Sequence, residues 1–268
     1  MERYEQIEQV DLHCHVLPGL DDGARDIEHA LAMLQVAAAD GTQIIVATPH
    51  ARRCEAAAVL AEAERLREAA ARRGLALQLL TGMEEQLLPD LLERLATGAA
   101  LPLGSTRWVL VELPDWTTWP PTISVQLEAL RTAGFRPILA HVERYIPVQR
   151  DPTVVLEAIA AGALLQVNAD SLFGQNGHPA QQTAVRLVRA GAVSVLASDA
   201  HSPDWRAPRL RAAFDRVAAL VDPERAQRLR ENALAIVHDT DLLPPQPDED
   251  SLTAPLSLLD RVRAWVGV

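Results

Sequence analysis

The chain has 268 residues, of which 49% are hydrophobic, and its 36 acidic residues outnumber 25 basic ones, so the formal net charge is -11. This acidic balance argues against general binding to nucleic acids or anionic membranes, which requires an excess of cations. All 25 basic residues are arginine. The lack of lysine excludes pyridoxal-phosphate enzymes, kinases and lysine-containing phosphate-binding loops, because each needs a lysine at its active site.

The cysteine content and the distribution of apolar residues indicate the cellular compartment. Two cysteines, Cys14 and Cys54, are too few for a disulfide framework. The first residues are charged rather than apolar, and no run approaches the roughly 18 apolar residues of a membrane-spanning helix. We therefore expect a cytoplasmic protein without stable insertion into a membrane.

Short β-like runs alternate with helical patterns along the chain. The expected strands are Val10–His15, Gln43–His50, Ala76–Glu84, Trp108–Leu113, Arg136–His141, Ala163–Asn168 and Val193–His201. The expected helices are Ile27–Ala39, Ala56–Arg73, Asp90–Thr97, Thr122–Thr132, Val154–Ala161, Ala180–Arg189, Pro208–Val221 and Pro223–His238. The strand runs are almost continuously apolar, which is typical of strands covered on both faces.

Glycines such as Gly41 and Gly191 follow the helices, and prolines lie near helix starts, as helix termini favour. The alternation predicts a single-domain α/β fold with a parallel sheet. At this length a closed or nearly closed barrel is favoured, with a doubly wound open sheet as the alternative.

The pattern changes at the end of the predicted domain, which covers residues 1–242. Residues 243–255 are rich in proline and acidic side chains, which predicts a linker. Residues 256–268 are expected to form a short amphipathic helix with Leu258 and Trp265 on one side. We expect this helix to dock on its own domain, with self-association or partner binding as the alternative.

Five of the eight histidines and four carboxylates fall at or just after predicted strand ends. They are His13, His15, Asp22, His50, Glu84, Glu112, His141, Asp199 and His201. In a parallel barrel the carboxyl ends of the strands meet on one face, so these nine donors should meet there. Carboxylates so close together repel unless cations lie between them, which predicts two or three divalent metal ions. The mixed imidazole and carboxylate set suits manganese, iron or zinc better than magnesium alone.

Strand alternation refines this picture at the first strand. His13 and His15 are two residues apart and should point to one side, with Cys14 pointing to the other. His29, His178 and His238 do not follow strands in this way, and we expect structural roles for them.

The ordered stretches DLHCHVLPGLDDG, ATPH, TGMEE, VELP, HVERY, QVNAD and SDAH carry a family resemblance from about Val10 to Val237. The chain resembles the polymerase and histidinol phosphatase (PHP) superfamily. Within it, DLHCHVLPGLDDGARD, HVERY and SDAHSPDWR are similar to bacterial protein-tyrosine phosphatases encoded with capsule and exopolysaccharide genes. The resemblance implies a distorted (β/α)7 TIM-like barrel.

The resemblance also implies a centre of three divalent metal ions, usually manganese, with iron, zinc or magnesium as alternatives. The implied ligand sets are His13, His15, Glu84 and Asp199 for one ion, Glu84, Glu112 and His141 for a second, and Asp22, His50 and His201 for a third. By the same resemblance, Arg144 and Arg206 bind the phosphoryl group, which suits the planar fork of arginine. Arg52 and Arg53 follow His50 directly and are candidates for added positive potential at the rim.

The implied activity is hydrolysis of a phosphate monoester, first of all phosphotyrosine on a protein such as a tyrosine kinase of a polysaccharide locus. Three alternatives stay open: a small-molecule phosphatase of the histidinol-phosphate or nucleotide kind, an amidohydrolase with a single metal ion, and a non-catalytic barrel. A cysteine-dependent tyrosine phosphatase is excluded, because such enzymes need an arginine six residues after the nucleophile. Leu20 follows Cys14 at that spacing, and Leu60 follows Cys54.

Overall fold

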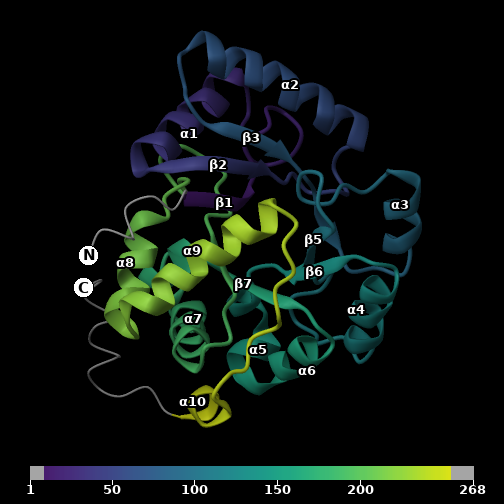
Figure 1. Ribbon diagram of the computed structural model, residues 1–268, viewed down its shortest axis with the longest axis vertical. Helices are drawn as coiled ribbons and strands as arrows, with labels where there is room; N and C mark the ends of the chain where they lie inside the picture. The colour runs from purple at the N-terminus through teal and green to yellow at the C-terminus, as the bar shows by residue number, and fades with distance from the viewer. Residues whose placement is uncertain (1–8, 255–268) are drawn as a thin grey trace.

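The computed structural model describes residues 9–254 (Figure 1). Its strands are β1 (Gln9–Cys14), β2 (Thr42–Ala47), β3 (Gln78–Thr81), β4 (Glu84–Gln86), β5 (Trp108–Glu112), β6 (Arg136–Leu139), β7 (Leu164–Asn168) and β8 (Val195–Ala197). The α-helices are α1 (Ile27–Asp40), α2 (Ala56–Arg72), α3 (Leu91–Thr97), α4 (Ile123–Thr132), α5 (Ile146–Arg150), α6 (Val155–Ala160), α7 (His178–Ala190), α8 (Arg211–Leu220), α9 (Pro223–Val237) and α10 (Glu249–Thr253). Three short 3-10 helices are η1 (Val142–Arg144), η2 (Pro152–Val154) and η3 (Ala169–Phe173).

All paired strands run parallel and form two sheets in the orders β1-β2-β3 and β4-β5-β6-β7-β8. The single strand predicted over Ala76–Glu84 is thus two strands, interrupted at Gly82 and Met83. Gly82 lies against the segment that contains Leu103, because a Cβ on Gly82 would come within 2.9 Å of the Leu103 side chain. The Gly82 N–H still donates to the Ala47 carbonyl at the end of β2, whereas the Met83 N–H points the other way and donates to the Leu101 carbonyl. The second half, β4, pairs with β5.

Isolated parallel bridges connect the two sheets at the ends of the strands. Cys14 bridges to Ala200 and His50 to Glu84. The Asp199 N–H donates to the His13 carbonyl over 2.8 Å, which links the end of β1 to the turn after β8. The predicted single-domain α/β fold of parallel strands is confirmed, whereas full closure into one barrel stays a prediction.

Side chains at alternate strand positions point to the inner side of the sheets, where they form an apolar layer and a polar layer. On this face Leu110 of β5 is followed by Glu112, and Leu164 of β7 is followed by Gln166 and Asn168, because side chains alternate along a strand. The two leucines belong to an apolar cluster that also contains residues of β1, β2, β6 and α9. The interior is therefore apolar where the strands begin and polar where they end.

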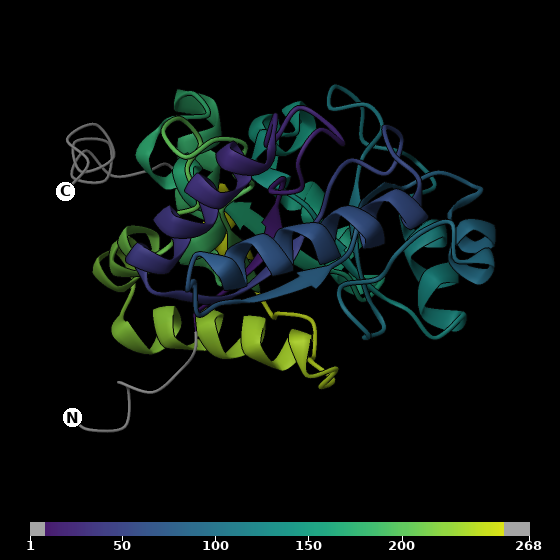
Figure 2. The same ribbon diagram turned by 90° about the horizontal axis from the view of Figure 1, so that it is seen from above.

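Helices cover the outer faces of the strands. Cys14 lies in a cluster with residues of α1 and α2, on the side opposite to the neighbouring histidines, as alternation predicts. Helix α9 crosses the end of the sheets where the strands begin, away from the loops that follow them (Figure 2). Its Arg230 donates to Gln9 at the start of β1, and its Asn232 donates to the Ser194 carbonyl beside β8.

Helix caps follow the residues that helix termini favour. Asp26 accepts a hydrogen bond from the His29 N–H at the start of α1, and Asp222 accepts one from the Arg225 N–H at the start of α9. Gly41 ends α1 with a φ of 98°, in the left-handed region that glycine adopts without strain.

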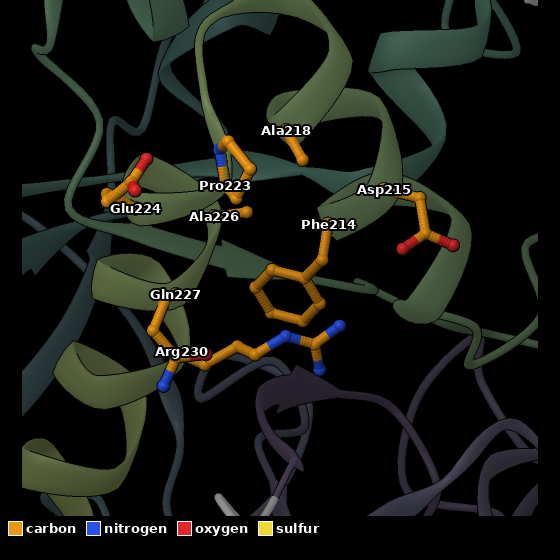
Figure 3. A pocket seen from close by; sticks show the side chains of 8 residues that line it. All are labelled: Phe214, Asp215, Ala218, Pro223, Glu224, Ala226, Gln227 and Arg230. Carbon is orange, nitrogen blue, oxygen red and sulfur yellow. The ribbon is translucent and has the colours of Figure 1, made fainter. Parts of the chain in front are cut away.

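A cavity of about 280 Å³ lies between α8 and α9, away from the strand ends. Figure 3 shows its lining residues, Phe214, Asp215, Ala218, Pro223, Glu224, Ala226, Gln227 and Arg230. The guanidinium of Arg230 stacks on the Phe214 ring at 3.9 Å from the centroid. None of the predicted metal ligands borders this cavity.

The predicted linker over residues 243–255 contains a short helix, α10, which its composition did not suggest. Leu252 of α10 is fully buried, and the Asp248 N–H donates to the Ala190 carbonyl at the end of α7. This part of the segment is thus packed on the domain. The amphipathic helix predicted over 256–268 lies outside the described residues. No helix within residues 9–254 combines the length and the apolar character needed to cross a membrane.

Candidate active site

The structure brings all nine predicted ligands together at the carboxyl ends of the strands. Among residues 9–254, three groups have ligand atoms within 4.8 Å of one another. The groups are His13 with His15 and Glu84, then His50 with Glu84 and Glu112, and lastly His15 with Asp22, His50 and His201. Because His15, His50 and Glu84 each belong to two groups, the three groups form one continuous cluster.

The two histidines of the first strand face each other through their outer ring nitrogens. Nε2 of His13 and Nε2 of His15 are 3.1 Å apart. The same two atoms lie 3.5 and 3.3 Å from Oδ1 of Asp199 and 3.4 and 3.5 Å from the carboxylate oxygens of Glu84. Two facing imidazole nitrogens between two carboxylates is the arrangement expected around a shared cation.

Glu84 lies at the centre of the cluster and is almost fully buried. Its Oε1 is 2.7 Å from Nε2 of His141, and its Oε2 is 2.7 Å from Nδ1 of His50. Burial by itself would raise the pKa of Glu84, but His13 and the other imidazoles lower it well below the usual value. The pKa of Glu112 instead rises to about 7, through burial and the nearby charge of Glu84. The ionised form of Glu84 is thus favoured, and its charge disfavours ionisation of the neighbouring Glu112, as expected for close like charges.

Three of the five histidines have Nδ1 held by an oxygen that is not a predicted ligand atom, which leaves Nε2 directed at the cluster. Nδ1 of His13 lies 3.2 Å from Oε1 of Gln166, and Nδ1 of His15 lies 2.7 Å from Oδ2 of Asp21. Nδ1 of His201 lies 2.9 Å from the Asp199 carbonyl. Such partners fix the tautomer of metal-binding histidines. The residues present therefore fit a centre of divalent metal ions, in donor type as well as in orientation.

The imidazole pKa values follow these contacts. Burial opposes protonation of His15, but hydrogen bonds with Asp199 and Asp21 outweigh it and raise the pKa to about 10. Burial and the charge of His15 together lower the pKa of His201 to about 3. The pKa of one imidazole is thus raised and that of its neighbour lowered, because the two rings are close enough for the charge of one to disfavour protonation of the other.

Asp22 lies at the open side of the cluster, with its side chain 49% exposed. Its Oδ1 is 3.4 Å from Nε2 of His50 and 3.8 Å from Nε2 of His201. Arg53 reaches the same oxygen over 3.2 Å, whereas Arg52 pairs with Asp90 over 2.9 Å. Both arginines border a cavity of about 130 Å³ that also contains His50. They therefore lie at the predicted rim, with Arg53 nearer to the ligand cluster.

Asp199 connects the ligand cluster to the two predicted phosphate-binding arginines. Its Oδ1 faces His13 and His15, whereas its Oδ2 lies 2.9 Å from Nη1 of Arg144 and 2.6 Å from Nη2 of Arg206. Both arginines border a second cavity of about 130 Å³ together with predicted ligands. Burial would raise the pKa of Asp199, but His13, His15 and Arg206 lower it well below the usual value.

Three of these residues have backbone conformations that side chains with a Cβ rarely adopt. The φ angles of His141, Asp199 and Arg206 are 35°, 51° and 53°. Non-glycine residues with positive φ are uncommon, and such strain concentrates at functional sites. The same turns explain why β6 and β8 end at Leu139 and Ala197, before the strand ends predicted from the sequence.

Several supporting residues were not predicted. Gln166 accepts the His141 N–H over 2.9 Å besides contacting His13, and Asn168 donates to Oδ2 of Asp199 over 2.7 Å. The buried carboxylate of Asp21 accepts the His50 N–H as well as contacting His15. The QVNAD stretch contained a signal for the amides, because residues 166 and 168 alternate onto the inner face of β7. The sequence DDG held no signal that separates Asp21 from Asp22.

Comparison with known proteins places this geometry in a family. The model of the CpsB/CapC family of capsular polysaccharide synthesis proteins matches residues 9–238. The chain belongs to the CpsB/CapC family. Tyrosine-protein phosphatase YwqE of Bacillus subtilis is a relative with 31% identity over 245 residues, which cover 89% of this chain and 96% of YwqE.

Solved structures agree with this membership. This chain superposes with a TM-score of 0.85 and 30% identity on one of the crystal structures of YwqE from Bacillus subtilis and CpsB from Streptococcus pneumoniae. These two proteins are metal-dependent tyrosine phosphatases. The match covers 89% of this chain and 99% of the solved one. A TatD-family hydrolase from Entamoeba histolytica, with a TM-score of 0.53 and 9% identity, shares the fold alone.

Proposed function

We propose that this CpsB/CapC protein is a metal-dependent phosphomonoester hydrolase that removes the phosphoryl group from phosphotyrosine in proteins. The observation that carries the proposal is the position of Asp199, whose two oxygens face the ligand cluster on one side and Arg144 and Arg206 on the other. A phosphoryl group in the cavity beside Asp199 would meet both groups at once. The names of the relatives as tyrosine phosphatases support this choice of substrate.

Three divalent ions, with manganese preferred, complete the proposed site. We assign His13, His15, Glu84 and Asp199 to one ion, Glu84, Glu112 and His141 to the second, and Asp22, His50 and His201 to the third. Glu84 lies 3.4 Å from His13 of the first set and 2.7 Å from His141 of the second, which supports its assignment to both sets. When bound, such ions lower the pKa of water towards neutrality and offset charge on phosphoryl oxygens.

The protein residues bind and orient the phosphoryl group. Arg144 and Arg206 present planar guanidinium donors to its oxygens, and charge-assisted bonds of this kind strengthen as negative charge develops there. Asn168 and both arginines share Oδ2 of Asp199, so they hold this carboxylate in place while its Oδ1 stays directed at the ligand cluster. Hydrolysis transfers the phosphoryl group to water and releases the phenol of tyrosine, a leaving group that needs little help from an acid.

The proposed partner is a phosphotyrosine-bearing protein, namely a tyrosine kinase of a polysaccharide locus. The family description, capsular polysaccharide synthesis, supports this assignment.

We further propose that the protein works in the cytoplasm. Both of its cysteines are free thiols, with Cys14 buried, which agrees with a reducing compartment.

Hydrolysis of a phosphotyrosyl peptide before and after chelation, and after readdition of manganese, tests the proposal. We expect activity that disappears with the metal and returns with it. His13→Ala should lose more than about 100-fold in kcat/KM, whereas His178→Ala, an exposed histidine that contacts Gln182, should not. Full activity of the metal-free protein would refute the mechanism. A preference for histidinol phosphate or a nucleotide would redirect the substrate to the small-molecule alternative.

A further inference from the structure

Trp116 borders the cavity that is also lined by Arg144, Arg206 and Asp199. It belongs to the loop between β5 and α4, which follows Glu112 at the carboxyl end of its strand. The indole is only partly buried, and it is the one aromatic side chain, apart from imidazoles, that borders this cavity within the described residues. The indole is neither a predicted metal ligand nor a predicted phosphate-binding group.

The indole is held in position by its neighbours. Its ring centroid lies 5.2 Å from that of His141 and 6.2 Å from that of Tyr145, which it meets edge-on. The Trp116 carbonyl accepts the Ile146 N–H over 2.8 Å, which fixes the loop to the start of α5. The Tyr145 hydroxyl in turn accepts the Leu113 N–H, so the aromatic pair is anchored to the end of β5. Such a ring costs little conformational entropy when a ligand packs on it.

Its contact with Arg144 defines where a substrate would lie. The guanidinium carbon of Arg144 is 4.4 Å from the centroid of the indole, and the Nη1 of the same group reaches Asp199 over 2.9 Å. A phosphoryl group bound by Arg144 would therefore lie next to the indole, and so would the group esterified to it. An aromatic ester could pack on this ring at the separation of about 4.5–7 Å that aromatic pairs prefer, whereas a small aliphatic one could not.

We propose that Trp116 forms an aromatic wall that binds the ring of an aryl phosphate and so contributes the preference for phosphotyrosine over aliphatic phosphates. The proposal rests on the proposed function, because it takes the adjacent arginine as the phosphate ligand. It adds a specificity residue outside the metal ligands and the phosphate-binding arginines. Trp205, on the other side of Arg206, is 68% exposed and does not border the cavity, so it is not part of this wall.

Binding of a phosphonate pair to the manganese-loaded protein tests the wall without any turnover. Phenylphosphonate and methylphosphonate share the anionic group and differ only in the ring, and calorimetry gives the Kd of each. The wild-type protein should bind the phenyl compound more tightly by about three- to tenfold, the size of one aromatic contact. Trp116→Leu should abolish this preference while the Kd of methylphosphonate changes less than about twofold. Trp116→Phe should retain most of it.

Trp119→Leu serves as the matched control, since its indole lies in the same loop but donates to Glu157 and does not border the cavity. If Trp116→Leu weakened both phosphonates equally, Trp116 would act only by supporting Arg144, and the proposal would be overturned. Equal wild-type affinities for the two compounds would overturn it even if Trp116→Leu failed to fold. Failure of the proposed function looks different: both phosphonates bind, yet phosphotyrosine is not hydrolysed.

Discussion

Replacing Gln166 by methionine should weaken metal binding although the residue is not a ligand. The amide is fully buried midway along β7 and makes three contacts. Its Oε1 accepts from Nδ1 of His13 over 3.2 Å and from the His141 N–H over 2.9 Å, and its Nε2 donates to Asn168 over 2.8 Å. Methionine has a similar volume and makes none of these hydrogen bonds.

The magnitude follows from what is left unpaired. The His141 N–H and Oδ1 of Asn168 would stay buried without these partners, and each such group costs about 1–3 kcal/mol. The free energy of unfolding of the metal-free protein should therefore fall by about 2–6 kcal/mol. His13 would lose the acceptor that keeps the proton on Nδ1, and loss of such a partner lowers metal affinity by about 10- to 100-fold.

Calorimetric titration with manganese and urea denaturation of the metal-free protein measure the two effects separately. Gln126→Met is the matched control, because the side-chain partners of this half-buried glutamine of α4 are Thr122 and the Leu87 carbonyl, neither of which is a predicted ligand group. Its manganese affinity should equal that of the wild type. Wild-type manganese affinity in Gln166→Met would refute the view that this amide selects the metal-binding tautomer of His13.

Three further predictions address the remaining parts of the site. Asp21→Asn should weaken manganese binding by about tenfold, since the carboxylate that holds Nδ1 of His15 is lost; unchanged calorimetric affinity would contradict this role. Manganese at 100 times its Kd should stabilise the folded protein by about 2.7 kcal/mol, and a chelator should reverse the rise in melting temperature; an unchanged melting temperature would argue against a metal centre. Arg206→Lys should lower kcat/KM by about 10- to 100-fold with manganese affinity preserved, because lysine cannot form the planar two-point contact; equal losses in both quantities would point to a structural role.

The secondary structure could be predicted well where the local signal was strong. The runs that became β1, β5 and β7 agree with the predicted strands within one residue at each end, because their apolar residues are nearly continuous, as is typical of strands buried on both faces. The division of the third strand could not be predicted. It depends on the approach of Leu103 to Gly82, a contact between segments whose proximity only the fold creates.

The ligand cluster could be predicted as a set because strand ends converge whatever the details of the loops. All nine predicted donors do lie together, yet the grouping into separate ions is less distinct than the family resemblance implied. His50 shows why. It lies 2.7 Å from Glu84 and 3.4 Å from Asp22, so its ring faces two of the implied ion positions at once. Which position an imidazole serves depends on its side-chain torsions, which the sequence does not encode locally.

Asp21 and Asp22 illustrate the same limit at neighbouring positions. Both are acidic and follow the same strand, so residue type and spacing treat them alike. In the structure the side chain of Asp21 is buried against His15, while that of Asp22 is 49% exposed between His50 and His201. The difference arises at Gly23, where a Cβ would lie 2.0 Å from the His15 carbonyl oxygen, so the chain turns back against β1 there. That turn places the carboxylate of Asp21 at Nδ1 of His15 and the carboxylate of Asp22 near Nε2 of His50 and of His201. A predicted metal ligand and the residue that orients another ligand can thus be adjacent in sequence. Only a backbone contact with the end of the preceding strand distinguishes them.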